Sequence, residues 1–222
     1  MSGGATIHDT RVALLWDDDN LYVGFWVEEP FVEATLTERD SPIYNDNDVE
    51  VFIAGRDAYY EFEINALGTI YEVFFVWDDA MAMFPELSRE ASGARPWNGV
   101  DFTDHPRGGR VGFWEWDFPG LRTAVAIDGT LNDNTDRDRG WTVELVLPWE
   151  GMRRLADGRS LPPSDGDTWR MSFSRFNQYK EASPAIDSSG WTMSPHGVWD
   201  SHIPELFPYI RFSTKPVPNR EV

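Results

Sequence analysis

The sequence predicts an all-β fold, an antiparallel two-sheet β-sandwich of the jelly-roll type with long loops. Many short segments alternate apolar and polar residues with the period of two that a half-buried strand requires. Clusters of turn residues separate these segments, and the sequence lacks the strand–helix–strand alternation of a parallel sheet. The chain has 222 residues, of which 41% are hydrophobic, and this is enough for one such domain with a sizeable core.

The first predicted element is a β-hairpin near the start of the chain. Residues 11–16 and 21–27 are β-rich runs, and Asp17-Asp18-Asp19-Asn20 lies between them. Because Asp and Asn tolerate the left-handed backbone conformation, this segment predicts a four-residue hairpin loop.

Further strands are predicted along the rest of the chain by the same alternation. They are expected at 48–54, 59–65, 69–77, 121–127, 140–147, 169–177 and 207–212. A short Gly-containing loop joins the strands at 59–65 and 69–77, which predicts a second hairpin. The last two strands are expected to pair with each other.

Helical signals are few. Residues 148–155 are expected to form one or two turns, because Pro148 stands at a first-turn position. Segment 78–119 carries little periodicity but several Trp and Gly residues, and loops of this length inside a compact domain are often functional. We expect one domain over residues 1–213 and a polar, Pro-containing tail at 214–222.

The composition excludes several classes of function. With 38 acidic and 19 basic residues the formal net charge is −19, so phosphate-rich nucleic acids and anionic membranes are poor partners. A neutral glycan is indifferent to this charge. The absence of cysteine excludes disulfides, thiol catalysis and Cys-ligated zinc. No apolar run approaches the roughly 20 residues that span a bilayer.

Aromatic residues close to acids and amides indicate a binding site. Tyr44 precedes the acid- and amide-rich segment 45–50, which runs directly into a predicted strand, and Trp199 lies in a late segment rich in Pro and aromatic residues. An aromatic face stacks well against a sugar ring while fixed polar groups bond the hydroxyls. The sequence contains no comparably clear nucleophile, metal or phosphate motif.

The predicted strands place polar groups together. Glu61, Glu63 and Asn65 alternate with apolar residues and share one strand face, while Glu50 shares a face with Asp48. This row of acid and amide groups favours a binding surface, although a solvated strand face is the alternative.

Several short sequence segments, in their order along residues 10–213, resemble the family 9 carbohydrate-binding modules and their relatives. The segments are Thr10-Arg11-Val12 to Trp16-Asp17-Asp18, Leu21-Tyr22-Val23, Asn47-Asp48-Val49-Glu50-Val51-Phe52-Ile53, Tyr60-Glu61-Phe62-Glu63-Ile64-Asn65, Gly140-Trp141-Thr142-Val143-Glu144 with Pro148-Trp149, and Trp191-Thr192-Met193-Ser194-Pro195-His196-Gly197. The resemblance implies a β-sandwich, which agrees with the strand pattern.

The resemblance also implies a function. In the family, two aromatic side chains clamp a terminal sugar, and acids, amides and a basic residue bond its hydroxyls; by local match Tyr44 and Trp199 form the clamp. The implied carbohydrate-binding residues are Tyr44, Glu50, Glu63, Asn65, Arg175, Asn177, Trp191 and Trp199. The chain is then a non-catalytic module for an oligosaccharide or a polysaccharide chain end, accessory to a glycan-degrading enzyme.

Two departures from the family pattern stand out. Tyr44 occupies a position where the binding modules have Trp. The family also has a further strand upstream of the Thr10-Arg11-Val12 segment, so we expect an open sheet edge here, which invites pairing with another chain.

Calcium is the expected ion. The resemblance implies structural calcium, and calcium takes six to eight oxygen ligands, which acidic loops supply. The candidate ligands are Asp17, Asp19, Asp46 and Asp48, and the loop at 132–138 has a similar composition. A hydrated turn is the alternative at each place. We expect no other cofactor.

Two other functions stay open from the sequence. A glycan-active hydrolase would need two carboxylates about 5–10 Å apart, and Asp48, Glu50, Glu61 and Glu63 are the candidates. The third hypothesis is a structural or interaction module that has lost its ligand. The four histidines are scattered. His196 and His202 could reach a sugar from the 191–199 loop, but histidines in such positions are more often structural.

The expected location is extracellular or periplasmic, as part of a longer exported protein that also carries a catalytic domain. The segment Met1-Ser2-Gly3-Gly4-Ala5-Thr6 has neither the basic region nor the apolar core of a signal peptide. The alternative reading of this start is an intracellular protein.

Overall fold

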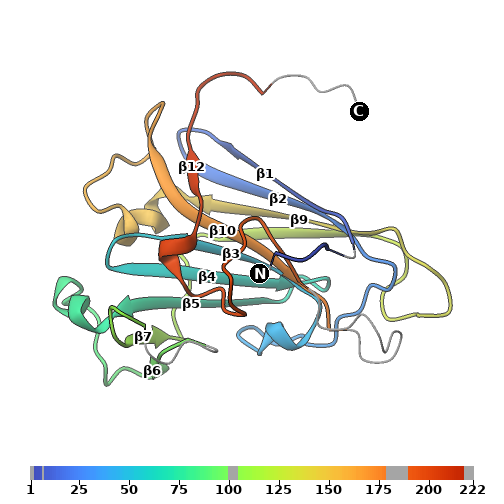
Figure 1. Ribbon diagram of the computed structural model, residues 1–222, viewed down its shortest axis with the longest axis horizontal. Helices are drawn as coiled ribbons and strands as arrows, with labels where there is room; N and C mark the ends of the chain where they lie inside the picture. Colours follow the sequence, from blue (N-terminus) through green and yellow to red (C-terminus); the bar gives the residue numbers. More distant parts are fainter. Residues whose placement is uncertain (1–2, 7, 100–104, 179–189, 218–222) are drawn as a thin grey trace.

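Two antiparallel sheets packed face to face form the fold of this chain (Figure 1). The computed structural model describes residues 3–6, 8–99, 105–178 and 190–217. The predicted all-β sandwich is therefore confirmed.

The smaller sheet contains four strands in the order β1, β2, β9 and β8. Their bounds are Thr10–Trp16 for β1, Asn20–Glu28 for β2, Gly140–Pro148 for β9 and Arg122–Asp128 for β8. Trp16 lies opposite Leu21 across the β1–β2 hairpin, so the loop at 17–20 has the four residues that were predicted. Strand β1 lies at an edge of this sheet.

The larger sheet contains eight strands in the order β11, β10, β3, β4, β5, β7 and β6, with β12 also paired to β10. The bounds are Asp48–Ala54 for β3, Ala58–Asn65 for β4, Ile70–Trp77 for β5, Ala94–Trp97 for β6, Arg110–Phe113 for β7, Thr168–Phe176 for β10, Gly190–Thr192 for β11 and Tyr209–Arg211 for β12. Short 3-10 helices lie at Ile43–Asn45 (η1), Asp78–Met83 (η2), Trp149–Leu155 (η3) and Pro204–Leu206 (η4).

The main core lies between the two sheets, because each sheet turns an apolar face toward the other. Phe25 of β2 meets Phe173 of β10 across this space, with ring centroids 6.1 Å apart. Both rings are fully buried, and burial of each stabilises the fold by about 2–3 kcal/mol.

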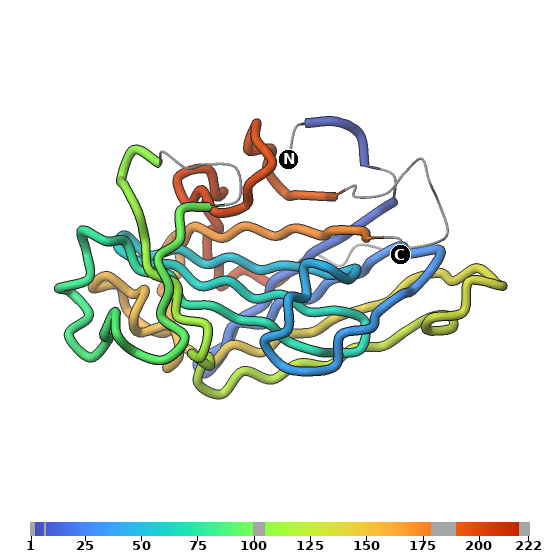
Figure 2. Tube along the Cα trace, turned by 90° about the horizontal axis from the view of Figure 1, so that it is seen from below, coloured from blue at the N-terminus to red at the C-terminus, as the bar shows by residue number. Residues whose placement is uncertain are grey.

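The larger sheet is buried on both faces, unlike the smaller one. Its outer face carries a second cluster that includes Phe52, Tyr59 and Phe75. Figure 2 shows the C-terminal segment (red) on the side of the larger sheet that faces away from the smaller sheet. A strand face covered in this way can hold a cavity, and the polar residues predicted to share it become buried.

The predicted strands agree with the structure except in three places, one of which is the three-residue strand β11, which was not predicted. Segment 78–119, expected to lack regular structure, contains η2, β6 and β7, and β7 pairs with β5. Strand β6 is only four residues long and contains Pro96, so it shows no alternation that the sequence could reveal. The strand expected at 207–212 is confined to β12, which pairs with β10 as predicted.

The turns expected at 148–155 are present as the 3-10 helix η3. No helix among the described residues has the length and apolar character needed to cross a membrane.

Candidate functional site

The outer face of the larger sheet contains a cavity of about 480 Å³. Its floor comes from strands β3, β4 and β5, and its walls come from η1, from β6 with the residues after β7, and from the segment that follows β11. Seven aromatic side chains line it: Tyr44, Tyr71, Phe75, Trp97, Trp114, Phe176 and Trp199. The volume is within the range of small-molecule sites.

Tyr44 and Trp199, separated by most of the chain, line this same cavity. Tyr44 is 48% exposed and meets Tyr71 edge to face at 6.0 Å. Trp199 is 44% exposed and meets Phe176 edge to face at 5.4 Å. Both rings are thus held by an aromatic neighbour while much of their surface stays accessible.

A second aromatic wall comes from the segment on either side of β7. The indole Nε1 of Trp114 donates a hydrogen bond to the Tyr71 hydroxyl at 2.7 Å, which fixes the ring against β5. Trp97 packs against the His202 ring at 4.0 Å. The Arg95 guanidinium lies over Trp114 at 5.4 Å and adds a cation–π contact at the rim.

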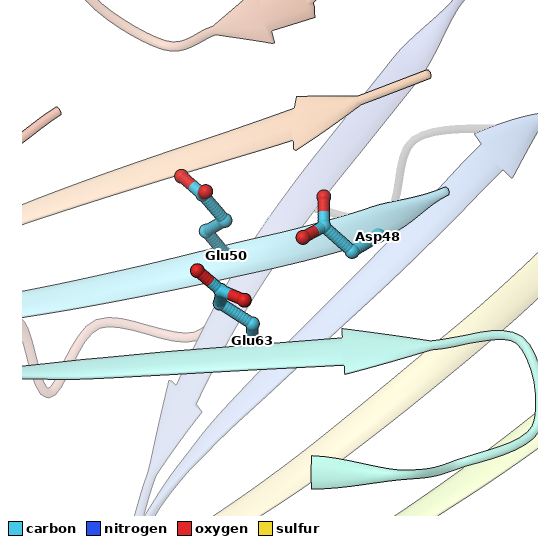
Figure 3. A group of neighbouring side chains, drawn as sticks. All are labelled: Asp48, Glu50 and Glu63. Atoms are coloured by element: carbon cyan, nitrogen blue, oxygen red, sulfur yellow. The ribbon is translucent and has the colours of Figure 1, made fainter. Parts of the chain in front are cut away.

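Carboxylates form the floor of the cavity. Glu50 of β3 lies directly opposite Glu63 of β4, and Asp48 lies opposite Asn65. Figure 3 shows Asp48 and Glu50 rising from β3 and Glu63 reaching toward them from β4. Glu50, Glu61 and Glu63 line the cavity and are at most 5% exposed, and Asp48 is fully buried.

Few donors reach these carboxylates. Glu50 Oε2 accepts hydrogen bonds from Ser174 Oγ at 2.6 Å and Ser201 Oγ at 3.3 Å. Glu61 Oε1 lies 3.2 Å from His202 Nε2.

Burial of the Glu50 carboxylate raises its pKa to about 8; the hydrogen bond from Ser174 lowers the pKa and the Glu61 charge raises it. Burial also raises the pKa of Glu61 to about 8, with the nearby Asp200 charge acting in the same direction. Burial lowers the pKa of His202 to about 3, so its ring is neutral at physiological pH. The floor is therefore rich in acceptor oxygens and poor in cations.

Arg110 is a buried cation that organises the wall behind His202. Its guanidinium lies between the rings of Trp77, at 4.5 Å, and Trp97, at 4.8 Å. It donates to the Tyr59 hydroxyl at 2.7 Å and to the His202 carbonyl at 2.8 Å. These contacts hold Trp97 at the cavity.

Of the eight residues expected to bind sugar, four line the cavity: Tyr44, Glu50, Glu63 and Trp199. Asn65 shares the strand face of Glu63, but its side chain makes hydrogen bonds to neighbouring loops. Its Nδ2 donates to the Leu36 carbonyl at 2.9 Å, and its Oδ1 accepts from the Thr69 amide at 3.0 Å. The Asn65 amide therefore fixes chain turns instead of facing the cavity.

Arg175, Asn177 and Trp191 lie outside the cavity for a geometric reason. On β10, Ser174 points to the outer face with Glu50, so Arg175 points the other way, between the sheets. There Arg175 Nη2 pairs with Glu29 Oε2 at 2.9 Å, and Asn177 Nδ2 donates to Glu29 Oε1 at 3.0 Å. Trp191 lies opposite Arg175 and packs on the main core.

Two of the calcium ligands expected in loops, Asp17 and Asp46, accept hydrogen bonds from backbone amides. Asp17 Oδ1 accepts from the amides of Asp19 and Asn20, at 2.9 and 2.8 Å, which closes the β1–β2 hairpin loop. Asp46 Oδ2 accepts from the amides of Thr35 and Leu36, at 2.7 and 2.8 Å.

The 132–138 loop is ordered in the same way, with Thr130 Oγ1 donating to Asp136 and the Thr135 amide to Asp133. Of the four candidates, only Asp48 belongs to a buried group with metal-ligand spacing among the residues that the structure describes.

Sequence reasoning missed several lining residues, among them Tyr71, Trp97, Trp114 and Asp200. The available signal was the pair of Trp residues in the long 78–119 segment, whose length indicated a functional loop. His202 was expected to be structural, and it lines the cavity while bonding to its walls.

Residues 7–81 match the family model described as carbohydrate-binding family 9. A protein from Bacteroides uniformis described as carbohydrate-binding has a similar structure, with a TM-score of 0.59 and 16% identity, over 93% of this chain and 79% of that one.

A family 9 carbohydrate-binding module from Caldicellulosiruptor kristjanssonii, solved with glucose and with cellotriose, gives a TM-score of 0.52 at 15% identity, over 99% of this chain and 84% of that one. No curated protein matches the sequence. At these identities the solved structures establish the shared sandwich fold, and together with the family model they confirm the resemblance found in the sequence.

Proposed function

We propose that this chain, a domain of the family 9 carbohydrate-binding type, is a non-catalytic module that binds a carbohydrate in the outer cavity of its larger sheet. The observation that carries the proposal is one cavity in which two half-exposed aromatic rings lie above a floor of carboxylates. The structural neighbour from Caldicellulosiruptor kristjanssonii was solved with glucose and with cellotriose, which supports the same ligand class here.

Tyr44 and Trp199 would supply the stacking surfaces. A pyranose has apolar C–H faces and a polar rim of hydroxyls, so it suits aromatic walls above polar groups. Glu50, Glu61 and Glu63 offer acceptors for the hydroxyls. Ser201, which lines the cavity as well, offers a hydroxyl that both donates and accepts.

The expected affinity is moderate. Each stacked ring that removes roughly 50 Å² of apolar sugar surface from water contributes about 1.2 kcal/mol. Each net hydrogen bond adds about 1 kcal/mol. After the cost of association, a net of about −4 to −7 kcal/mol corresponds to a Kd between roughly 1 mM and 10 µM. This range suits a module that keeps an enzyme near its polymer by repeated weak binding.

Calorimetric titration with glucose, cellobiose, cellotriose and xylobiose, followed by a wider glycan array, tests the proposal. Saturable heat with at least one sugar, lost in Trp199→Ala, is the expected result. If no glycan binds, and Trp199→Ala behaves like the parent protein, the chain is an interaction module that keeps the fold without a sugar.

A hydrolase is the second candidate, and one observation favours it. Burial raises the pKa of Glu50 and of Glu61 to about 8, which is the direction that a general acid requires. The same oligosaccharides, incubated with the protein and followed by chromatography, separate the two functions. A binding module leaves them intact, whereas products that disappear in Glu50→Gln would identify an enzyme.

The setting is a further part of the proposal. A module that concentrates an enzyme on a polysaccharide works outside the cell, beside a catalytic domain. This setting requires binding to the polymer itself, which sedimentation of the protein with insoluble cellulose and xylan measures. Depletion from the supernatant, reversed by soluble cellotriose, is the expected outcome.

A further inference from the structure

We propose that Asp48, Glu50 and Glu63 hold one calcium ion at the floor of the cavity, and that this ion takes part in carbohydrate binding. The second half of this inference rests on the proposed function. The first half concerns the buried carboxylates alone and is tested separately.

The three side chains have the spacing of a metal site. Each offers a carboxylate oxygen, and these oxygens all lie within 4.8 Å of one another. Asp48 and Glu50 stand two residues apart on β3, so they project from the same face, and Glu63 reaches in from β4 (Figure 3). Two hydrogen-bonded strands therefore fix all three ligands, which makes the arrangement rigid.

The oxygens lack the partners that burial normally demands. Both carboxylate oxygens of Asp48 are enclosed without a hydrogen-bond partner of good geometry among the described residues. One oxygen of Glu63 is in the same condition, and so is one oxygen of the adjacent Glu61. Buried polar groups are almost always paired, so the unpaired oxygens of Asp48 and Glu63, two members of a group with metal-ligand spacing, indicate a missing positive partner.

The surrounding charges are of the wrong sign to serve as that partner. The charged groups that act most strongly on Asp48 are the carboxyl groups of Glu50, Glu61 and Asp46. Those that act on Glu63 are the carboxyl groups of Glu61, Asp48 and Glu50.

The two buried arginines near this sheet are engaged elsewhere. Arg110 donates to the Tyr59 hydroxyl, and Arg175 pairs with Glu29 on the opposite face of the sheet. A bound divalent cation would supply the positive charge that the protein leaves out.

Calcium is the ion that the donors favour. Every ligand is a carboxylate oxygen, and such ligands favour hard cations over zinc or copper. Calcium accepts six to eight oxygens in flexible geometry, including bidentate carboxylates, whereas magnesium requires a near-ideal octahedron and keeps several waters. Strand-fixed carboxylates with free oxygens suit calcium better.

The position of the site relates the ion to the sugar. Glu50 and Glu63 line the cavity, whereas Asp48 is fully buried behind them. Three side chains leave coordination positions to be filled by other oxygens. Those positions would face the cavity, where hydroxyls of a bound sugar can enter them. Sugar binding and calcium binding would then strengthen each other.

The first experiment concerns the ion alone. Calcium chloride is titrated into chelator-treated protein by calorimetry, and thermal unfolding is measured with and without calcium. Saturable binding of one ion and a Tm rise of about 5–10 °C at a free calcium concentration about 100-fold above Kd are expected. Absence of both heat and Tm shift would overturn the site, and tighter binding of magnesium than calcium would overturn the choice of ion.

Variants locate the ion. Asp48→Asn and Glu63→Gln should weaken calcium binding by more than about tenfold, because each removes one ligand charge. In chelator, both should unfold at or above the parent Tm, since a buried carboxyl group whose oxygens lack partners has been replaced by a neutral amide. Asp133→Asn is the matched control in an exposed acidic loop and should leave the calcium response unchanged. If Asp133→Asn alone removes the response, the ion binds in the loop and the inference is wrong.

The second experiment adds cellotriose in excess calcium and in excess EGTA. A Kd at least about tenfold lower with calcium supports the joint site, by the reciprocity of coupled binding. Equal affinity in both conditions overturns the ion's part in sugar binding and leaves the proposed function intact. Binding in neither condition counts against the proposed function, while the calcium titration still decides the ion site.

Discussion

Replacing Trp199 by alanine tests the aromatic part of the binding site. The ring is 44% exposed, lines the cavity and meets Phe176 edge to face. Its removal takes away a stacking surface without opening the main core, so the fold should persist. The change in sugar affinity therefore reports the stacking contact itself.

The exposed area of this ring sets the magnitude. A Trp side chain presents up to about 250 Å², so a fraction of 44% leaves roughly 110 Å² in water, of which about half belongs to one face. Covering about 55 Å² contributes about 1.4 kcal/mol at 25 cal/mol per Å². The sugar face that is covered at the same time contributes a similar amount. The expected loss is thus about 1.4–2.8 kcal/mol, or a 10- to 100-fold rise in Kd.

Calorimetry with the best-binding sugar is the assay, and the chain offers a matched control. Trp26 is also 44% exposed, but it lies on β2 of the smaller sheet, against the Arg11 guanidinium. Trp26→Ala should keep the parent Kd within about twofold. Equal losses in both variants, or no loss in Trp199→Ala, would refute the stacking argument.

Three further predictions concern the other parts of the structure. Tyr44→Trp should lower the Kd about two- to threefold in the same titration, because a larger ring covers roughly 20 Å² more sugar surface. Burial raises the pKa of Glu72 to about 7 although Arg39 lowers it, so the folded state binds this proton more tightly than the unfolded chain. Glu72 should therefore contribute a loss of stability of up to about 3 kcal/mol as pH rises from about 4.5 through about 7, and urea unfolding of Glu72→Gln should show a pH slope that is smaller by this amount. Arg110→Met should lower the free energy of unfolding by about 2–4 kcal/mol in urea and also weaken sugar binding, because buried acceptors lose their donor and Trp97 loses its support.

The sequence predicted the sandwich because strand signals are local. Alternation alone placed Glu61 and Glu63 on the same face of one strand, and Glu50 with Asp48 on the same face of another. The structure shows that these two strands are paired and that the two sets lie side by side. The grouping of these carboxylates on strand faces could therefore be predicted from the sequence. The strand register that sets Glu50 opposite Glu63 needed the structure.

The same alternation contained a signal that was overlooked. On β10, Trp169, Met171 and Phe173 point into the main core, and Arg175 and Asn177 continue that series. Their assignment to the sugar site came from family resemblance and conflicts with this strand parity. An arginine that continues an apolar series is better interpreted as a buried ion-pair partner.

The wall formed by Trp97 and Trp114 depended on long-range packing, and the sequence indicated only that their segment could be functional. Trp97 and Trp114 reach the cavity because β6 and β7 extend the sheet beyond β5. Their positions depend on contacts such as the hydrogen bond to Tyr71, which connects residues 43 positions apart in the chain. Local patterns do not encode such contacts.

Cocrystallisation with cellotriose and calcium tests the central claim most directly. The account predicts a pyranose ring between Tyr44 and Trp199, at carbon contact distances of about 3.5–4 Å, with its hydroxyls toward the carboxylates of β3 and β4. A sugar bound away from these two rings, or a cavity without sugar at saturating cellotriose, would contradict it.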